Sequence, residues 1–309
     1  MSESPWQGRS DPSDNSRWHH IVEPTTSVTP NSYCIIGFNC DEGVRRNQGR
    51  IGAKAGPDKI RKMLSNLVYA GERRITDLGN VECEGNLLEK AQSNLAEKVA
   101  EVIKSTSLPL ILGGGHEVAW GTYQGIRQAH PKAKLGIINF DAHFDLRPLD
   151  PLPSSGTPFR QAALFAEENN VNFDYLVYGI NPSVNTDLLF KYAEKKNVQW
   201  KSDLSINSQT SDKSLEDLET YCDSLDYIYI TICLDVFPAS YCPGVSAPAA
   251  LGVEPNIILK LLERIKSQYA SKIVAFEIAE MNPAFDIDDR TARFAARLIH
   301  QFTQVQTAS

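Results

Sequence analysis

The chain has 309 residues, of which 42% are hydrophobic, and its formal net charge at pH 7 is −7. This composition allows a large core, and α/β folds of this length often form one domain. The acidic balance argues against a nucleic-acid partner, because phosphate binding needs a broad basic surface.

The cysteines and the N-terminal sequence are informative about the cellular compartment of the protein. The six cysteines include no Cys-x-x-Cys pair, and a chain of this size does not need disulfides, which predicts a reducing, cytoplasmic setting. The N-terminus lacks a basic segment followed by an apolar one, and no apolar run is long enough to cross a bilayer. We therefore expect no membrane partner.

The first part of the chain predicts an arm followed by a strand and a loop. Residues 1–30 have four prolines and little apolar periodicity, which predicts an extended arm, anchored by Trp6 and Trp18, before a single domain over 31–309. A strand is expected over 33–38 and a helix over 58–65, whose first turn suits Pro57. The loop between them carries three arginines, which would serve an anionic substrate beyond a strand end.

A glycine-rich turn follows the next strand. Apolar residues at helical spacing predict a helix from Leu88 to Val102, and a short buried strand is expected over 108–112. The sequence then reads Gly113-Gly114-Gly115-His116-Glu117 before a helix over 118–129. A phosphate cradle is disfavoured, because Gly-x-Gly-x-x-Gly is absent and no Lys-Ser/Thr follows. A ligand histidine at a strand-to-helix turn fits better.

The most informative stretch runs from Ile137 to Asp145. It begins as an apolar run and then alternates polar with apolar residues. In extended backbone, side chains two apart share a face, so Asp141, His143 and Asp145 would converge on one point. Two carboxylates and an imidazole suit a divalent metal ion. The alternative is a strand end whose aspartates cap a turn, with an isolated histidine.

The remaining sequence continues the alternation of strands and helices. Strands are expected over 175–178, 227–234 and 272–277, and helices over 158–168, 186–195 and 214–224, around 257–265 and around 294–302. This alternation predicts one α/β domain with three α/β/α layers and a mainly parallel sheet.

Polar residues follow several of these strands at the same end. Cys233 and Asp235 are two apart at the end of one strand, and Glu280 follows the last strand. Because parallel strands present their carboxyl ends at one edge of the sheet, these side chains would meet His116 and the Asp141–Asp145 segment. The combined set is large enough to hold two metal ions, which can activate a water molecule.

At this point the chain resembles the ureohydrolase superfamily of arginases and agmatinases, from Gly37 to Pro283. The resemblance rests on the motifs Gly113-Gly-Gly-His116-Glu117, Asp141-Ala-His143-Phe-Asp145, Leu234-Asp235-Val236 and Glu280-Met-Asn-Pro283. Three further stretches are most similar to the formimidoylglutamase branch, namely Asp41-Glu-Gly-Val-Arg-Arg-Asn47, Ser155-Gly-Thr-Pro-Phe-Arg160 and Pro243-Gly-Val-Ser-Ala-Pro248.

The resemblance implies an arginase-like fold and a binuclear manganese site, with two Mn²⁺ per subunit. His116 and Asp145 would hold one ion, His143 and Asp235 the other, and Asp141 would bridge them. A hydroxide between the ions would hydrolyse N-formimidoyl-L-glutamate to L-glutamate and formamide, a step of histidine degradation. Asp145 would pass a proton to the leaving amine, and Glu280 would pair with the cationic amidine.

Cys233 departs from the superfamily pattern, in which most members have a second bridging aspartate. A thiolate would keep the ligand charge, but it is a soft donor that bridges through a single atom. Three interpretations stay open at a metal site: direct ligation, a more weakly held metal pair, or an impaired site. A small apolar core residue is the fourth.

The implied substrate carries two carboxylates, which arginine recognises well. Arg46, Arg147, Thr157 and Arg160 are the candidate substrate-binding residues, and a surface salt bridge is the alternative for each arginine. Two other functions stay open: an agmatinase-like or guanidino-acid ureohydrolase, and a catalytically silent metal-binding homologue. The partner is expected to be a small dicarboxylate, and a homo-oligomer is compatible with the sequence.

Overall fold

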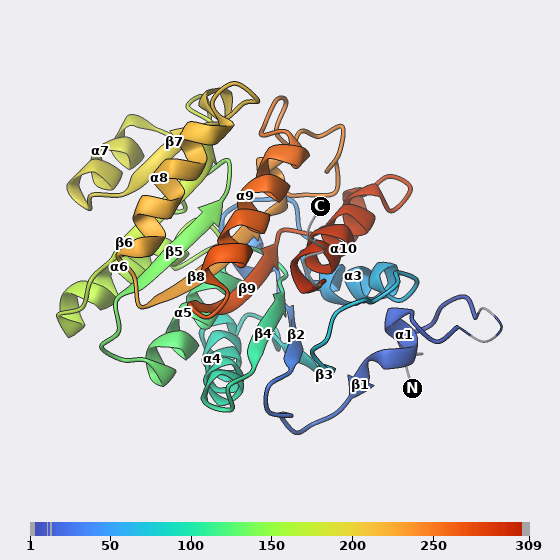
Figure 1. The fold of residues 1–309 in the computed structure, drawn as a ribbon. Helices are drawn as coiled ribbons and strands as arrows, with labels where there is room; N and C mark the ends of the chain where they lie inside the picture. Colours follow the sequence, from blue (N-terminus) through green and yellow to red (C-terminus); the bar gives the residue numbers. More distant parts are fainter. Residues whose placement is uncertain (1–3, 11, 13, 305–309) are drawn as a thin grey trace.

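A single parallel sheet forms the centre of the molecule (Figure 1). The structure, a computed structural model, describes residues 4–10, 12 and 14–304. Within them the strand order is β1-β3-β2-β4-β9-β8-β5-β6-β7, and all eight neighbouring pairs are parallel. The strands are β1 (Glu23–Pro24), β2 (Tyr33–Asn39), β3 (Ile75–Glu82), β4 (Leu108–Leu112), β5 (Leu135–Phe140), β6 (Asp174–Ile180), β7 (Gln199–Ser202), β8 (Tyr227–Cys233) and β9 (Ile273–Ala279).

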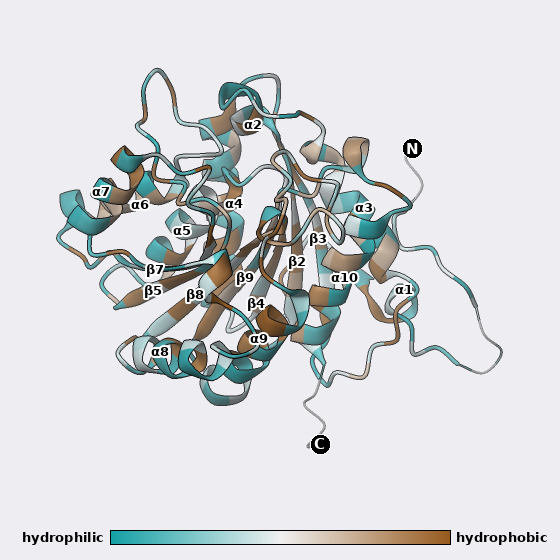
Figure 2. Ribbon diagram, turned by 90° about the horizontal axis from the view of Figure 1, so that it is seen from above, coloured by the Kyte–Doolittle hydropathy of each residue, from teal (hydrophilic) through white to brown (hydrophobic). Residues whose placement is uncertain are grey.

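Helices cover both faces of the sheet, as the view from above shows (Figure 2). One face carries α3 (Gly56–Leu64), α8 (Ser211–Asp223), α9 (Pro255–Tyr269) and α10 (Arg290–Thr303); the other carries α4 (Leu88–Lys104), α5 (Val118–Ala129) and α6 (Pro158–Asn169). Shorter helices are α1 (Trp18–Ile21), α2 (Glu42–Arg46) and α7 (Asp187–Lys195), with single turns η1 (Ala53–Ala55), η2 (Asp203–Ser205), η3 (Leu234–Val236) and η4 (Pro283–Phe285). The predicted three-layer α/β/α class is confirmed.

Two apolar cores lie on opposite faces of the sheet. In β8, Ile228, Ile230 and Ile232 pack into the core beneath α8, α9 and α10, whereas Tyr229 faces the core beneath α4, α5 and α6. A strand buried on both faces reads as a nearly continuous apolar run. Because the central strands are buried on both faces, their sequences are apolar enough to predict them as strands.

Four adjacent strands end level with one another in the middle of the sheet. Leu112 of β4 pairs with Ile278 of β9, Ile278 pairs with Ile232 of β8, and Ile232 pairs with Phe140 of β5. Strands β4 and β5 end in this row, and β8 and β9 end one residue after it. The motifs that follow these four strands therefore begin side by side at one edge.

Strand β3 was not predicted, because its sequence does not look like a central strand. It contains Asp77, Asn80 and Gly79, whose φ is +71°, and such residues are depleted in strands. A tertiary interaction explains the conformation: the buried Arg61 of α3 donates from Nη2 to Asp77 at 2.8 Å. This ion pair joins β3 to the helix that covers it.

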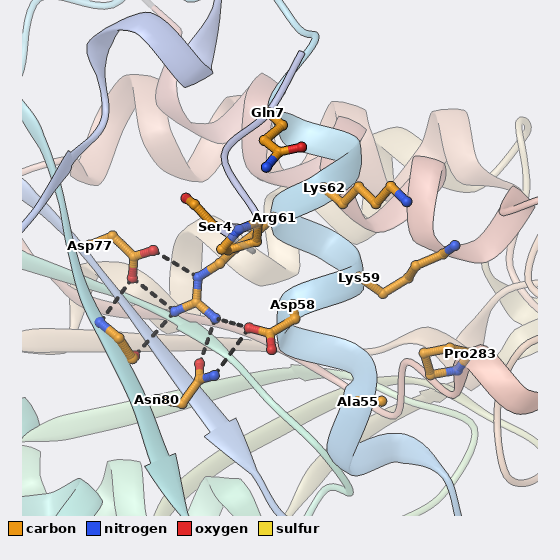
Figure 3. Close-up of a pocket in the computed structure, with 12 residues that line it drawn as sticks. Ser4, Gln7, Ala55, Asp58, Lys59, Arg61, Lys62, Asp77, Asn80 and Pro283 are labelled. Carbon is orange, nitrogen blue, oxygen red and sulfur yellow. Dashed lines mark hydrogen bonds and ion pairs between the residues drawn. The ribbon is translucent and has the colours of Figure 1, made fainter. Parts of the chain in front are cut away.

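The N-terminal arm lies against α3 and β3, and Figure 3 shows where they meet. Trp6 and Trp18 are both buried, and the indole of Trp6 donates to Asp77 at 2.6 Å. A pocket of about 530 Å³ lies between part of the arm, α3 and β3 and is lined by Arg61 and Asp77 among others. Residues 1–3, 11 and 13 of the predicted arm, and 305–309 of the predicted domain, lie outside the described residues.

Among the described residues, no helix combines the length and apolar character needed to cross a membrane.

Candidate metal centre

His116 reaches the sheet edge through the three glycines that follow β4. The backbone passes so close to the end of β2 that a Cβ on Gly114 would collide with the carbonyl oxygen of Cys40. Gly115 donates its N–H to that same carbonyl at 3.0 Å. The glycines are therefore required for close approach, and they place His116 just before α5, buried at the level of the neighbouring strand ends.

The Asp141–Asp145 segment converges by a route that differs from the predicted one. Strand β5 ends at Phe140, so these residues are not extended. The Asp141 carboxylate accepts the backbone N–H of His143 at 2.8 Å, and Asp145 is left-handed with φ of +49°. Aspartate competes for nearby backbone donors and tolerates this conformation. A tight turn, rather than a period of two, brings the three side chains to one side.

Asp235 is also carried by a turn. Strand β8 ends at Cys233, and the next three residues form the single helical turn η3. The buried Asp235 carboxylate lies with Oδ2 3.1 Å from Nδ1 of His143. The expectation of an extended strand through Asp235 was wrong, but the structure brings this side chain to the same edge.

The donor atoms form two groups that share Asp141. In one group Nδ1 of His116 lies 2.9 Å from Oδ2 of Asp141 and 3.1 Å from Oδ2 of Asp145. In the other, Nδ1 of His143 lies 3.5 Å from Oδ1 of Asp141 and 3.1 Å from Asp235. Donors about 3 Å apart match an octahedral ion with bonds of about 2.1 Å. Asp141 turns one oxygen to each group, as a bridging carboxylate would.

The polar atoms that have no partner support a metal site. Among the described buried atoms, Nδ1 of His116 and Oδ1 of Asp235 have no hydrogen-bond partner, although carboxylate oxygens lie beside the imidazole. Buried polar atoms are rarely left unsatisfied. Carboxylate oxygens suit Mn²⁺, whereas imidazole nitrogens suit several divalent transition-metal ions, so this donor set is compatible with the predicted manganese pair.

Cys233 lies on the metal face of the sheet edge. Its Sγ and donor atoms of His116 and Asp141 all lie within 4.8 Å of one another, and its side chain is buried. Burial, followed by the charges of Asp141 and Asp235, raises the pKa of the Cys233 thiol well above its usual value. Without bound cations the sulfur is therefore a neutral thiol.

The buried carboxylates at this edge of the sheet need compensating positive charge. Burial alone would raise the pKa of Asp141, but the imidazoles of His116 and His143 lower it overall. Burial and the Asp141 charge raise the pKa of Asp145 to about 6. Burial would lower the pKa of His116, but the two carboxylates beside it raise it well above the usual value. In the free protein, protons thus occupy positions that divalent ions would take.

Glu280 faces the centre from the end of β9. Its backbone is left-handed with φ of +69°, and its Oε1 accepts the backbone N–H of His116 at 2.9 Å. Its Oε2 is buried and has no hydrogen-bond partner among the described residues. Burial, followed by the charges of Glu117 and Asp235, raises its pKa to about 8. This unsatisfied oxygen is suited to a cationic group of a ligand.

Arg46 is enclosed by protein groups. Its side chain is 9% exposed, and its guanidinium contacts Glu42 at 2.9 Å and Glu89 at 2.6 Å. It also donates to the carbonyls of Asn86 and Pro153. These contacts tie α2 to α4 and to the loop after β5.

The other candidate substrate residues lie on the loop that follows the metal-binding turn and in the first turn of α6. Arg147 donates its N–H to Gly156 at 2.9 Å and is exposed, and no described residue pairs with its guanidinium. Arg160 donates to the carbonyl of Leu146 at 3.2 Å and lies over the Tyr192 ring. The buried Thr157 hydroxyl accepts the N–H of Ser154 at 2.9 Å, which shapes the turn before α6. These contacts hold the segments that carry Arg147, Thr157 and Arg160 next to one another, with the Arg160 guanidinium directed at Leu146 and Tyr192.

Thr231 and Glu277 were not singled out from the sequence. The hydroxyl of Thr231 lies 3.1 Å from Nε2 of His116 and donates to Glu277 at 2.9 Å. The signal was present, because Thr231 is two residues before Cys233 in an apolar strand and Glu277 is a charge inside another. A charge within a buried strand indicates a specific partner.

Comparisons with known proteins concern the family and the fold of the chain. The model of the Arginase family matches residues 31–304. A formimidoylglutamase of Vibrio vulnificus strain CMCP6 is 45% identical over 311 residues, covering 95% of this chain and 92% of that protein. The formimidoylglutamase structure of Bacillus subtilis has a TM-score of 0.86 at 24% identity, covering 96% of this chain and 93% of that one. The Trypanosoma cruzi formiminoglutamase structure with Mn²⁺ has a TM-score of 0.79 at 25% identity and covers 94% and 98%.

Proposed function

The chain belongs to the arginase family, and from this premise we propose that it hydrolyses N-formimidoyl-L-glutamate to L-glutamate and formamide. The observation that carries the proposal is the pair of donor groups joined by Asp141, beside the unsatisfied oxygen of Glu280. The name of the Vibrio vulnificus relative supports the same substrate.

We propose that the centre holds two Mn²⁺ ions. His116 and Asp145 would hold one ion, His143 and Asp235 the other, with Asp141 between them and Cys233 beside them. When bound, such a pair activates a water molecule as nucleophile and stabilises the negative charge that develops on attack. The manganese in the Trypanosoma cruzi structure supports this choice of metal.

The side chains of this protein orient the substrate and move its protons. Glu280 presents a buried carboxyl group to the cationic amidine, whose charge favours the ionised form of that group. The resulting pair places the formimidoyl carbon next to the activated water. The water oxygen bonds to that carbon, the bond from the carbon to the glutamate nitrogen breaks, and both water hydrogens end on that nitrogen. Asp145 is placed to transfer them as a general base and then a general acid.

The two substrate carboxylates distinguish this substrate from agmatine. Arg147 lies on the loop that follows Asp145, whereas Arg160 lies in the first turn of α6, where Phe159 donates its N–H to the Asp145 carbonyl at 3.3 Å. The start of α6 is thus tied to the metal-binding turn, and the two arginines can bind carboxylates while Thr157 shapes the turn before the helix. The contacts of Arg46 favour a structural role, in which Arg46 holds neighbouring segments in place, over direct contact with the substrate.

We also propose a reducing, cytoplasmic setting, supported by six cysteines that are all free. The only partner that the site calls for is the small dicarboxylate substrate, and a homo-oligomer stays a prediction.

Product identification tests the proposed reaction. The Mn²⁺-loaded protein is incubated with N-formimidoyl-L-glutamate in water enriched in ¹⁸O, and the products are analysed by NMR and mass spectrometry. We expect equal amounts of L-glutamate and formamide, with ¹⁸O in the formamide. Release of ammonia and N-formylglutamate would show that the other C–N bond breaks. Urea from agmatine or guanidinobutyrate, without formamide, would favour a different ureohydrolase.

A further inference from the structure

The side of His116 that faces away from the candidate metal centre is held by a buried hydroxyl. Nδ1 faces the carboxylates of Asp141 and Asp145, whereas Nε2 lies 3.1 Å from Oγ1 of Thr231. Thr231 is fully buried, and the Phe159 ring packs edge-on against the imidazole with ring centres 5.4 Å apart. The imidazole therefore has one defined orientation and one hydrogen-bond partner at Nε2.

Thr231 is in turn held by a buried carboxylate. Thr231 and Glu277 are paired neighbours on β8 and β9, and the hydroxyl donates to Oε1 at 2.9 Å. Tyr229 donates to the same oxygen at 2.6 Å, and Thr122 donates to Oε2 at 2.5 Å. Glu277 is completely buried. Burial raises the pKa of the Glu277 carboxyl, while the charge of His116 and the hydrogen bonds from these three hydroxyls oppose that rise. As a carboxylate, Glu277 only accepts hydrogen bonds, so the three hydroxyls directed at it satisfy it.

The directions of these hydrogen bonds determine the state of His116. A threonine hydroxyl has one hydrogen, and Thr231 gives it to Glu277, so its oxygen can only accept from the imidazole. We infer that Thr231 and Glu277 are positioning residues that keep the hydrogen of His116 on Nε2 and leave the Nδ1 lone pair for a metal ion. This inference rests on the proposed metal centre and assigns it a second layer of residues.

The inference predicts an effect on metal affinity that differs from an effect on packing. Residues that orient a metal-binding histidine typically change metal affinity by about 10- to 100-fold when replaced. Thr122 offers a matched control, because it is also fully buried and donates to Glu277 but makes no described contact with the His116 ring. Thr231→Val and Thr122→Val each remove one hydroxyl from the same carboxylate with little change in volume.

Two measurements on the full chain test the inference. Isothermal titration of metal-free protein with Mn²⁺ gives the dissociation constant, and long-range ¹H–¹⁵N spectra of ¹⁵N-histidine-labelled protein show which ring nitrogen of His116 carries hydrogen. We expect Thr231→Val to raise the dissociation constant by about 10- to 100-fold and to change the Nε2 signal. Thr122→Val should change the constant less than about threefold, and Thr231→Ser, which keeps the hydroxyl, should restore wild-type behaviour.

Equal dissociation constants for Thr231→Val and Thr122→Val would overturn the inference and make the network a packing feature. A His116 ring with its only hydrogen on Nδ1 in the wild-type protein would overturn it as well. If Thr231→Val does not fold, Glu277→Gln replaces it. The glutamine amide can donate a hydrogen bond to Thr231, which would reverse the donor and acceptor roles in the chain from His116 to Thr231 and residue 277. Failure of the wild-type protein to bind Mn²⁺ would count against the proposed function, while the NMR spectrum would still decide the inference.

Discussion

At the residue scale, we expect Cys233 to influence how tightly the candidate centre holds manganese. It is a buried thiol on the metal face, where an aspartate would offer two oxygen donors to an ion that prefers oxygen. We expect Cys233→Asp to lower the Mn²⁺ dissociation constant by about tenfold, equivalent to about 1.4 kcal/mol. Titration calorimetry measures the constant, and thermal unfolding with and without Mn²⁺ shows whether the variant is folded.

Cys222→Asp is the matched control for this change, because Cys222 of α8 is fully buried in the apolar core between this helix and the sheet. A carboxylate buried there should destabilise the protein with no gain in Mn²⁺ affinity. If Cys233→Asp behaves like this control, Cys233 is a core residue and the centre has a single bridging carboxylate.

Arg147 and Arg160 should determine preference for a dicarboxylate. Each is expected to make one charge-assisted contact with a substrate carboxylate, and loss of such a contact costs about 1.5–3 kcal/mol. We therefore expect Arg147→Ala and Arg160→Ala each to lower kcat/KM for N-formimidoyl-L-glutamate by about 10- to 150-fold, with Mn²⁺ affinity almost unchanged. Steady-state kinetics with saturating Mn²⁺ measures the effect.

The control is Arg74→Ala, which removes an exposed arginine that pairs with Glu23 near the start of β3, at the opposite edge of the sheet. Its kcat/KM should equal that of the wild type. Unchanged kcat/KM in both Arg147→Ala and Arg160→Ala would remove the proposed carboxylate pocket.

At the scale of elements, the ion pair between α3 and β3 should be a main source of local stability. Asp77 is buried, accepts from both Arg61 and Trp6, and is shared by helix, strand and arm. Breaking a buried pair costs about 3–5 kcal/mol, because the remaining charge is left uncompensated. We expect Asp77→Ala to lower the free energy of unfolding by that amount in urea denaturation.

Asp58→Ala is the comparison for Asp77→Ala, because Asp58 pairs with the same guanidinium at 3.1 Å but its side chain is 56% exposed. Exposed pairs contribute about 0–1 kcal/mol. Similar losses in the two variants would show that burial of Asp77 does not matter.

The elements also show which features the sequence could predict. The bounds of β4 and α5 agree with expectation, because Gly113 follows the short apolar run of β4 and Pro131 follows shortly after the helical segment of α5. Strand β3 was missed, since Asp77 and Asn80 are stabilised there by Arg61, a contact that no local pattern reveals. The Asp141–Asp145 turn was expected as a strand, because alternation along the sequence resembles a strand whether or not the backbone is extended.

At the scale of the whole molecule, the parallel sheet explains why motifs that are far apart in the sequence could be combined into one predicted site. Strands β4, β9, β8 and β5 end level with one another, so the residues that follow them lie close together. The orientation of the side chains within the site could not be predicted from the sheet in this way. The hydrogen bond from Thr231 to Glu277 and the enclosure of Arg46 depend on side-chain partners from distant segments.

The shared carboxylate of Asp141 is the central feature of the candidate centre, and counting bound ions tests it most directly. Metal-free wild-type protein and Asp141→Asn are titrated with Mn²⁺, the free ion is followed by electron paramagnetic resonance, and formamide release is measured in the same samples. We expect two ions per wild-type chain, with activity that rises as the second ion binds. Asp141→Asn should bind fewer than two ions and lose activity. One ion per wild-type chain with full activity, or two ions bound unchanged in Asp141→Asn, would contradict the shared-carboxylate centre.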